Sequence, residues 1–210
     1  MEKPTLQTIF KIGFAAYAAT KKLPVFIYKA AWSLIHCRTE VMGGHVQACP
    51  EGHYEKNHYN SCKHRICPQC AFIQVQRWLF KQKTRLLGCA HYHVIFTIPH
   101  ELNILWKYNS TLLTDMLFHS AIQTIQQLLT DKKHLGAMPG IIASLHTWSK
   151  TLMLHPHIHC LITGGGLNNG QWINLRRDYL FPIAAARILL QGKLLDAINK
   201  ALTNGQLILP

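Results

Sequence analysis

A nine-residue segment in which polar and apolar side chains alternate constrains the fold of this chain more than any other feature. Residues 155–163 read HPHIHCLIT and place His155, His157 and His159 at every second position. Successive side chains of a β-strand point to opposite faces, so the three imidazoles share one face while Ile158 points to the other, into the core. The segment therefore predicts a sheet with one buried face and one face that carries histidines.

Further segments of the second half of the chain also read as strands. HYHVIFTI, residues 91–98, carries a second His-x-His pair, and PGIIASLHTW, residues 139–148, carries His146. QWINL at 171–175 predicts a short fourth strand, and the three glycines at 164–166 predict a turn after the histidine strand. If the strands are neighbours, their histidine faces coincide and several imidazoles can converge on one cation.

Apolar residues at helical spacing predict the remaining elements. The segments are 5–36, with a break at Pro24, then 71–87, 101–130 and 184–202. From the strand at residue 91 onward the order is strand, helix, three strands and helix, with short connections between the strands. Such an order predicts an antiparallel sheet covered by helices, an α+β fold.

The segment between the first two helical regions is turn-rich and crowded with metal-binding side chains. It offers five candidate zinc ligands: Cys49, His53, Cys62, Cys67 and Cys70. A structural zinc site takes four tetrahedral ligands. Two pairs, Cys49 with His53 and Cys67 with Cys70, fill the four places, and Cys62 is an alternative to His53. A closed site of this kind leaves no place for a substrate, so the zinc is expected to be structural.

The charge of the chain favours a polyanionic partner. Lys and Arg number 22 against 9 Asp and Glu, a formal charge of +13, which suits nucleic acid or an anionic membrane surface. No run of about 20 apolar residues predicts a membrane span, and no export signal is recognised, so the seven cysteines are expected to stay reduced in the cytoplasm. Five basic residues are candidates for DNA binding: Lys63, Arg65, Arg77, Lys81 and Arg85. Lys63 and Arg65 could equally form, together with His64, a solvated loop.

Four blocks of this sequence, NSCKHRICPQC, HYHVIFTIPHEL, LHTW and HPHIHCLITGGGL, resemble successive motifs of the insertion sequence 91 transposases. These belong to the HUH (His-hydrophobe-His) superfamily of rolling-circle nucleases, and the resemblance runs from about residue 5 to residue 210. It implies a helical segment at 1–40, a zinc-binding module at 41–72 and a nuclease domain at 73–210. The implied partners are single-stranded DNA and transposon ends, in association with a bacterial nucleoid.

The resemblance also implies the chemistry. His157 and His159 would hold Mg²⁺ or Mn²⁺ together with a third ligand, and a tyrosine would attack the phosphorus of one DNA strand. Tyr179 is interpreted as a packed aromatic, so the nucleophilic tyrosines are expected beyond Pro210, in a truncated transposase. Two alternatives remain open: a non-catalytic, zinc-dependent DNA-binding fragment, and a metal-dependent hydrolase that uses water. The third ligand is open among His91, His93, His146 and His155.

Overall fold

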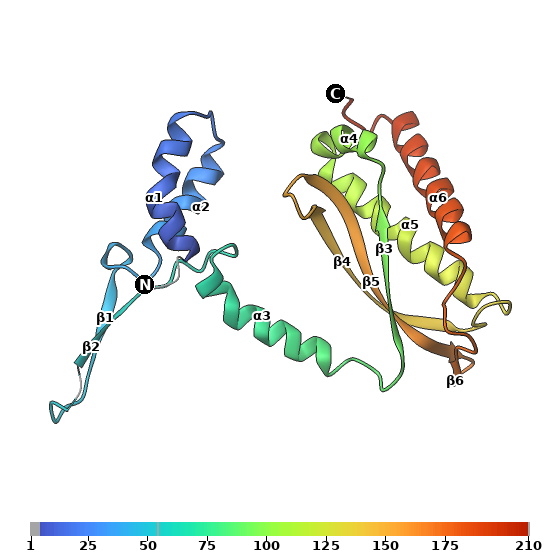
Figure 1. Ribbon diagram of the computed structural model, residues 1–210, viewed down its shortest axis with the longest axis horizontal. Helices are drawn as coiled ribbons and strands as arrows, with labels where there is room; N and C mark the ends of the chain where they lie inside the picture. Colours follow the sequence, from blue (N-terminus) through green and yellow to red (C-terminus); the bar gives the residue numbers. More distant parts are fainter. Residues whose placement is uncertain (1–4, 54, 210) are drawn as a thin grey trace. The chain divides into compact units, whose positions relative to one another are not determined.

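The computed structural model describes residues 5–53 and 55–209, which form two compact units. The first unit is Met1–Leu86 and the second is Leu87–Pro210. Helix α3 (Pro68–Lys83) belongs to the first unit (Figure 1). Residues 73–86, which we expected at the start of a nuclease domain, therefore group with the cysteine-rich module.

The first unit combines a helical hairpin with a β-hairpin and α3. The expected break at Pro24 is present, because proline has no N–H for a helix interior and here caps the second helix. Arg85 was expected on α3 but lies two residues beyond its end at Lys83. The other elements of the unit are α1 (Leu6–Ala19), α2 (Val25–His36), η1 (Glu40–Met42), β1 (Gly44–Ala48) and β2 (Glu55–Tyr59), the last two antiparallel.

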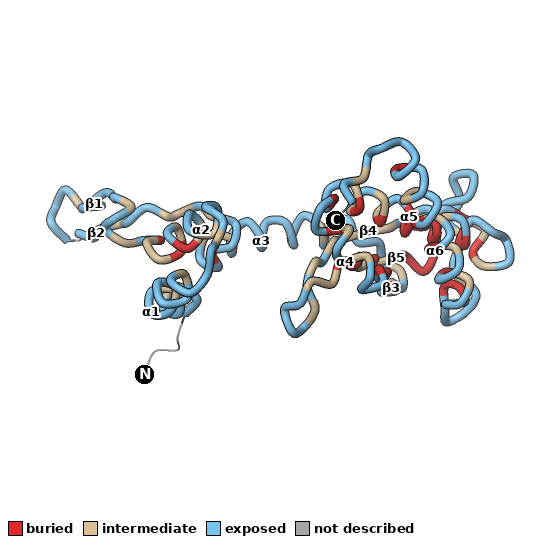
Figure 2. The backbone as a smooth tube through the Cα atoms, turned by 90° about the horizontal axis from the view of Figure 1, so that it is seen from above, coloured by how far each residue is buried: buried red, intermediate tan, exposed pale blue. Residues whose placement is uncertain are grey.

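The buried core of the first unit is small and built largely of cysteine. Leu34, Cys37 and Cys67 form it, and α3 and the β-hairpin bury no residue fully. In Figure 2 the tube of these elements is exposed along most of its length. A core of this size supplies little hydrophobic stabilisation, so the unit needs another source of stability such as a bound metal.

The second unit is an antiparallel sheet covered on one face by helices, which confirms the α+β prediction (Figure 1). The strand order is β3-β5-β4, and β6 pairs with the far end of β5. The elements are β3 (His91–Thr97), η2 (His100–Leu102), α4 (Asn103–Tyr108), α5 (Ser110–Thr130), β4 (Met138–Trp148), β5 (Leu154–Asn168), β6 (Gln171–Asn174) and α6 (Ile183–Thr203).

The helix expected over residues 101–130 is interrupted at Asn109. Its backbone leaves the helical region, with φ −131° and ψ 38°. Its side-chain amide donates to the carbonyl of Ile208 at 2.8 Å, and its carbonyl oxygen accepts from the Ile208 N–H at 2.8 Å. The buried asparagine thus ties the segment after α6 to the α4–α5 junction, a contact that no helical period predicts.

The alternation in β5 is confirmed. Ile158, Cys160 and Ile162 are fully buried and pack with α5 residues such as Leu117 and Ile125. The histidines therefore lie on the opposite face of the sheet, away from the helices. Burial of the apolar set holds the register, because a slip of one residue would put the imidazoles into the core.

The glycines at 164–166 do not form the turn that the sequence suggested, because all three lie inside β5. A Cβ on Gly165 would meet the Trp172 ring at 2.5 Å and one on Gly164 would meet the Tyr92 ring at 3.0 Å, so glycine allows the neighbouring side chains to lie close. The turn follows at Asn169 and Gly170, whose φ angles are +48° and +78°. This Asn-Gly pair is the usual two-residue β-hairpin loop, and it was visible in the sequence.

Candidate metal centres

Four cysteines converge in the first unit: Cys37, Cys62, Cys67 and Cys70. Their Sγ atoms all lie within 4.8 Å of one another. Cys37 caps the C-terminus of α2, Cys67 is the N-cap of α3, and Cys70 lies in the first turn of that helix. Cys62 lies in the loop that leads from β2 to α3. Helix ends and a loop, not one regular element, therefore bring the thiols together.

The separations between these sulfurs fit a tetrahedral ion. Sγ of Cys37 lies 3.4 Å from that of Cys70 and 3.6 Å from that of Cys67, and Sγ of Cys62 lies 3.6 Å from that of Cys70. Ligands at a Zn–S distance of about 2.3 Å in a tetrahedron would be about 3.8 Å apart. The four thiols therefore need to move only slightly to hold zinc, and four sulfur ligands close the site to substrate.

The thiols influence one another's protonation. Burial raises the pKa of Cys37 to about 12 and also raises the pKa of Cys62. Burial also acts to raise the pKa of Cys70, but hydrogen bonds from the thiols of Cys37, Cys62 and Cys67 and from the Lys63 backbone together outweigh it and lower that pKa to about 7. One thiolate is thus available near neutral pH, and zinc binding would release the protons of the others.

Cys49 and His53 do not join this cluster, contrary to the favoured two-pair arrangement. They lie with Glu51 beyond the end of β1, and His53 Nδ1 is 3.5 Å from Glu51 Oε2 in an exposed pair. Near the base of the hairpin, the Arg38 N–H donates to the carbonyl of Asn60 at 3.1 Å. This bond brings together Cys37, which precedes Arg38, and Cys62, which follows Asn60 by two residues. The cluster thus contains Cys62, the alternative ligand predicted from the sequence, and Cys37, which was not predicted.

A second cluster, of His146, His157 and His159, lies on the second unit's sheet. One ring nitrogen from each lies within 4.8 Å of the others. His146 of β4 is directly opposite His157 of β5, and its ring centroid is 4.2 Å from that of His159. Of the four candidates for third ligand, cross-strand pairing therefore brings His146 into the three-nitrogen cluster.

The other three candidates lie outside the group. The ring of His155 is 5.0 Å from that of His157 but is not part of the three-nitrogen cluster. His91 pairs with Thr163, four residues along β5 from His159. His93 contacts His159, with its Nε2 2.7 Å from the Nδ1 of that ring.

Hydrogen bonds and burial prepare two of these imidazoles to bind a cation. His157 Nδ1 lies 2.6 Å from the carbonyl oxygen of His155. A carbonyl only accepts, so Nδ1 carries the proton and Nε2 is free as a ligand. Burial, followed by the proximity of His146, His157 and His93, lowers the pKa of His159. The neutral ring is the form that binds metal, so the three imidazoles fit a divalent metal ion.

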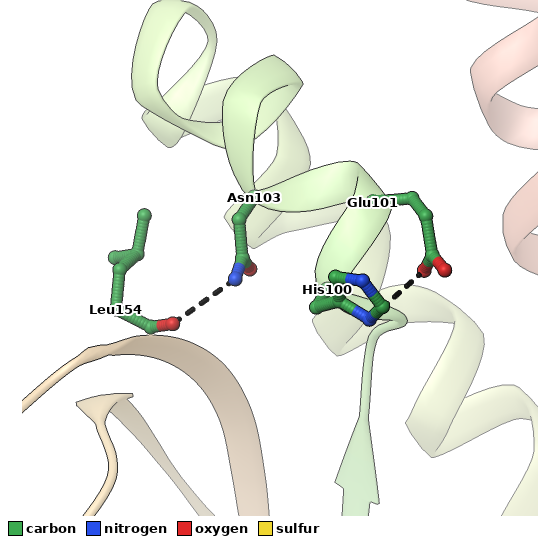
Figure 3. A network of polar contacts seen from close by, with 4 residues as sticks. All are labelled: His100, Glu101, Asn103 and Leu154. Atoms are coloured by element: carbon green, nitrogen blue, oxygen red, sulfur yellow. Dashed lines mark hydrogen bonds and ion pairs between the residues drawn. The ribbon is translucent and has the colours of Figure 1, made fainter. Parts of the chain in front are cut away.

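A polar contact fixes the start of the histidine strand. The side-chain amide of Asn103, at the start of α4, donates to the Leu154 carbonyl at 3.0 Å (Figure 3). This bond anchors the residue directly before His155 to the helical layer. His100 and Glu101 lie beside it in an exposed pair at 3.4 Å, which water screens and which stabilises little.

The five basic residues expected to contact DNA are all exposed on the first unit. Lys63 and Arg65 lie between the zinc-ligand candidates Cys62 and Cys67, and Lys63 has a positive φ of 51°. The other three lie on or just after α3: Arg77, Lys81 and Arg85.

Tyr179 lies after β6, in the segment that leads to α6. Its hydroxyl accepts a hydrogen bond from Arg177 Nη1 at 2.8 Å. Since β6 pairs with Gly165–Asn168, this segment begins at the opposite end of β5 from His157. The structure thus does not bring Tyr179 and the histidine cluster to one end of the sheet.

Comparison with known proteins identifies both parts of the chain. The transposase zinc-binding domain family of insertion sequence 91 matches residues 9–98, and a family described as "Putative transposase" matches residues 140–209. The chain is 35% identical over 173 residues to "Putative transposase y4qJ" of Sinorhizobium fredii, covering 81% of this chain and 44% of that protein. It is 35% identical over 147 residues to the transposase for insertion sequence element IS801 of Pseudomonas savastanoi, covering 68% of this chain and 34% of that protein.

Among solved structures, the conjugative relaxase TrwC in complex with oriT DNA has a TM-score of 0.41 at 18% identity, covering 51% of this chain and 42% of the relaxase. A metal-bound structure of the same relaxase has a TM-score of 0.39 at 15% identity, covering 51% and 42%. These TM-scores and identities are low, so the assignment of the chain to a family rests on the sequence matches.

The cysteine cluster and the matched domain define a protein with a zinc-binding domain followed by an α+β sheet. The chain belongs to the insertion sequence 91 family of transposases. It spans less than half the length of the curated relatives that it matches. Within residues 5–53 and 55–209, no helix is both long and apolar enough to cross a membrane.

Proposed function

We propose that this chain supplies the zinc module and the metal-binding nuclease sheet of a transposase that cuts and rejoins single DNA strands. The observation that carries this proposal is the cluster of His146, His157 and His159 on the sheet face opposite the helices. In this proposal the second unit is the nuclease domain and the first unit, which contains the cluster of Cys37, Cys62, Cys67 and Cys70, is the zinc module.

The protein's own part in the chemistry is to hold and orient a phosphate. Mg²⁺ or Mn²⁺ bound by the three imidazoles would polarise the scissile phosphate and stabilise the charge that develops on its oxygens. His157 is buried, His159 is half-buried and His146 is exposed, so the cluster is open on the side of β4. That opening is where a DNA strand would meet the site.

Single-stranded DNA is the proposed partner. The exposed residues of α3 would contact its phosphates, and the net charge of +13 would attract it from solution. Transposon ends are the proposed natural substrate, and the bacterial nucleoid is the proposed place of action. Zinc would act only through the fold of the first unit, because a site with four sulfur ligands has no open position.

Tyr179 is not the proposed nucleophile. A nucleophile must reach in-line attack distance from a phosphate held at the histidines, and Tyr179 follows a strand that pairs with the other end of β5. We therefore expect no covalent DNA adduct from the described residues. An adduct that survives denaturation and is lost in Tyr179→Phe would overturn this part of the proposal.

The metal site is tested by titrating zinc-loaded protein with Mn²⁺, followed by electron paramagnetic resonance. We expect saturable binding of about one Mn²⁺ per chain. It should weaken in His157→Ala by more than the roughly 10- to 100-fold that loss of an outer-shell partner costs, since a ligand itself is lost. His100→Ala, which changes an exposed histidine outside the cluster, is the matched control. Equal Mn²⁺ binding by wild type and His157→Ala would contradict the assignment.

A non-catalytic DNA-binding fragment is the second candidate function, favoured by the exposed basic residues of the first unit. Salt-sensitive binding of a single-stranded oligonucleotide, without cleavage in the presence of Mn²⁺, would favour this candidate. Metal-dependent nicking that needs His157 but forms no adduct would instead favour a hydrolase that uses water.

A further inference from the structure

We infer that His93 is a positioning residue that holds the metal ligand His159 in one orientation and one tautomer. The inference rests on the proposed divalent-metal site and adds a residue of a third strand to it. His93 is exposed on β3, whereas the three clustered nitrogens come from β4 and β5.

The contact between the two rings is a hydrogen bond and not a stacking interaction. His93 Nε2 lies 2.7 Å from His159 Nδ1, the ring planes differ by 13° and the centroids are 4.9 Å apart. Nitrogens this close in nearly parallel rings with distant centroids place the rings edge to edge. Each nitrogen then lies near the plane of the other ring, where its lone pair or N–H points.

The sheet register explains why these two rings meet. Ile95 is the direct partner of His159, and His93 is two residues further along the antiparallel strand, on the same face. His159 is therefore flanked by His146 from β4, which shares the metal cluster, and by His93 from β3. One neighbour can bind the ion, and the other can hold the ring.

The hydrogen bond determines which nitrogen of His159 is available. When a cation is bound at Nε2 of His159, Nδ1 of that ring carries the proton and donates it to His93 Nε2. His93 then carries its own proton on Nδ1. The same task at His157 is done by the backbone carbonyl of His155 at 2.6 Å. Of these two ligands, His159 is therefore the one whose orientation depends on a replaceable side chain.

Three variants test the inference by Mn²⁺ affinity, measured as above on zinc-loaded protein. His93→Ala removes the acceptor and is expected to weaken Mn²⁺ binding by about 10- to 100-fold. His93→Gln offers an amide oxygen as acceptor and is expected to recover most of the affinity. His91→Ala, on the same strand and face but opposite Thr163, should bind as wild type does.

The tautomer provides a readout that a purely structural role would not change. In ¹H–¹⁵N spectra of Mg²⁺-loaded protein, His159 should carry its proton on Nδ1 in the wild type. In His93→Ala it should show a mixture of tautomers, while His157 keeps its proton on Nδ1.

The outcomes separate this inference from the proposal beneath it. If the wild type binds no Mn²⁺ at the histidines, both the metal site and the role of His93 fall. If the wild type binds and His93→Ala binds equally well, the metal site stands and the positioning role is overturned. An equal loss in His93→Ala and His93→Gln would also overturn it, and would make His93 a ligand instead.

Discussion

The cysteine cluster of the first unit and the histidine cluster of the second differ in what holds them together. The cysteines come from two helix ends and a loop, around a core in which cysteine is a main component. The histidines project from regular strands whose other face packs on a large apolar core. We infer that metal organises the first cluster, whereas the sheet organises the second before any metal arrives.

This difference also separates the chemical roles of the two clusters. Four sulfurs enclose an ion completely, so the first site can contribute stability but not bind substrate. In the proposed divalent-metal site, three imidazoles on an open sheet face would leave coordination positions free for phosphate oxygens. Removing one ligand should therefore unfold the first unit, whereas in the second unit it should weaken metal binding and leave the fold intact.

The largest expected effect is that of Cys37→Ser on the first unit. A structural zinc in a small domain contributes about 10–16 kcal/mol of binding free energy, most of which is lost with one ligand. Zinc content by mass spectrometry should fall from about one per chain to near zero, and amide protection of α2 and α3 should be lost. Protection of β5 should persist.

Cys49→Ser is the matched control, since Cys49 belongs to the same module but lies outside the four-sulfur cluster. It should keep its zinc. Zinc loss from Cys49→Ser, with retention in Cys37→Ser, would restore the two-pair arrangement expected from the sequence and refute the cluster.

A smaller effect, on the stability of the second unit, is expected when the buried side chain behind the histidine strand is shortened. Ile158→Ala removes a fully buried side chain between His157 and His159 and should lower the free energy of unfolding of the second unit by about 2–5 kcal/mol. Urea unfolding followed by tryptophan fluorescence measures it. Ile95→Ala, which is 48% exposed on the histidine face, should change it by about 0.5 kcal/mol or less. Equal losses would mean that the two faces of the sheet are not distinct.

The smallest effect is expected from the basic residues of the first unit. Joint replacement of Arg77, Lys81 and Arg85 by Ala should weaken single-stranded DNA binding across sequences, because each phosphate contact releases counterions. Fluorescence anisotropy at several salt concentrations should show a slope of log K against log salt that is smaller by about 2.

Lys132→Ala with Lys133→Ala, two exposed lysines of the second unit, serves as the control and should leave that slope unchanged. Unchanged DNA affinity in the triple variant would make α3 a scaffold only.

The period of two in β5 was readable in the sequence because strand geometry is local, and it assigned the faces of His157 and Ile158 correctly. Cys37 was missed because a metal ligand set depends on separation in space, and this residue lies 25 positions before Cys62. The glycines at 164–166 were wrongly predicted to form a turn. Glycine occurs both in turns and where neighbouring groups pack closely against a strand, and the sequence alone does not distinguish the two.

Alternation, helical spacing and the crowd of cysteines thus determined by themselves an α+β chain with a zinc-binding module and a histidine face. Only the tertiary structure decided which histidine joins His157 and His159 and which thiols meet. Strand register places His146 opposite His157, and the base of the β-hairpin brings Cys37 to Cys62. Both are pairings between segments distant in sequence. The local sequence pattern of a segment does not determine which distant segment will pair with it.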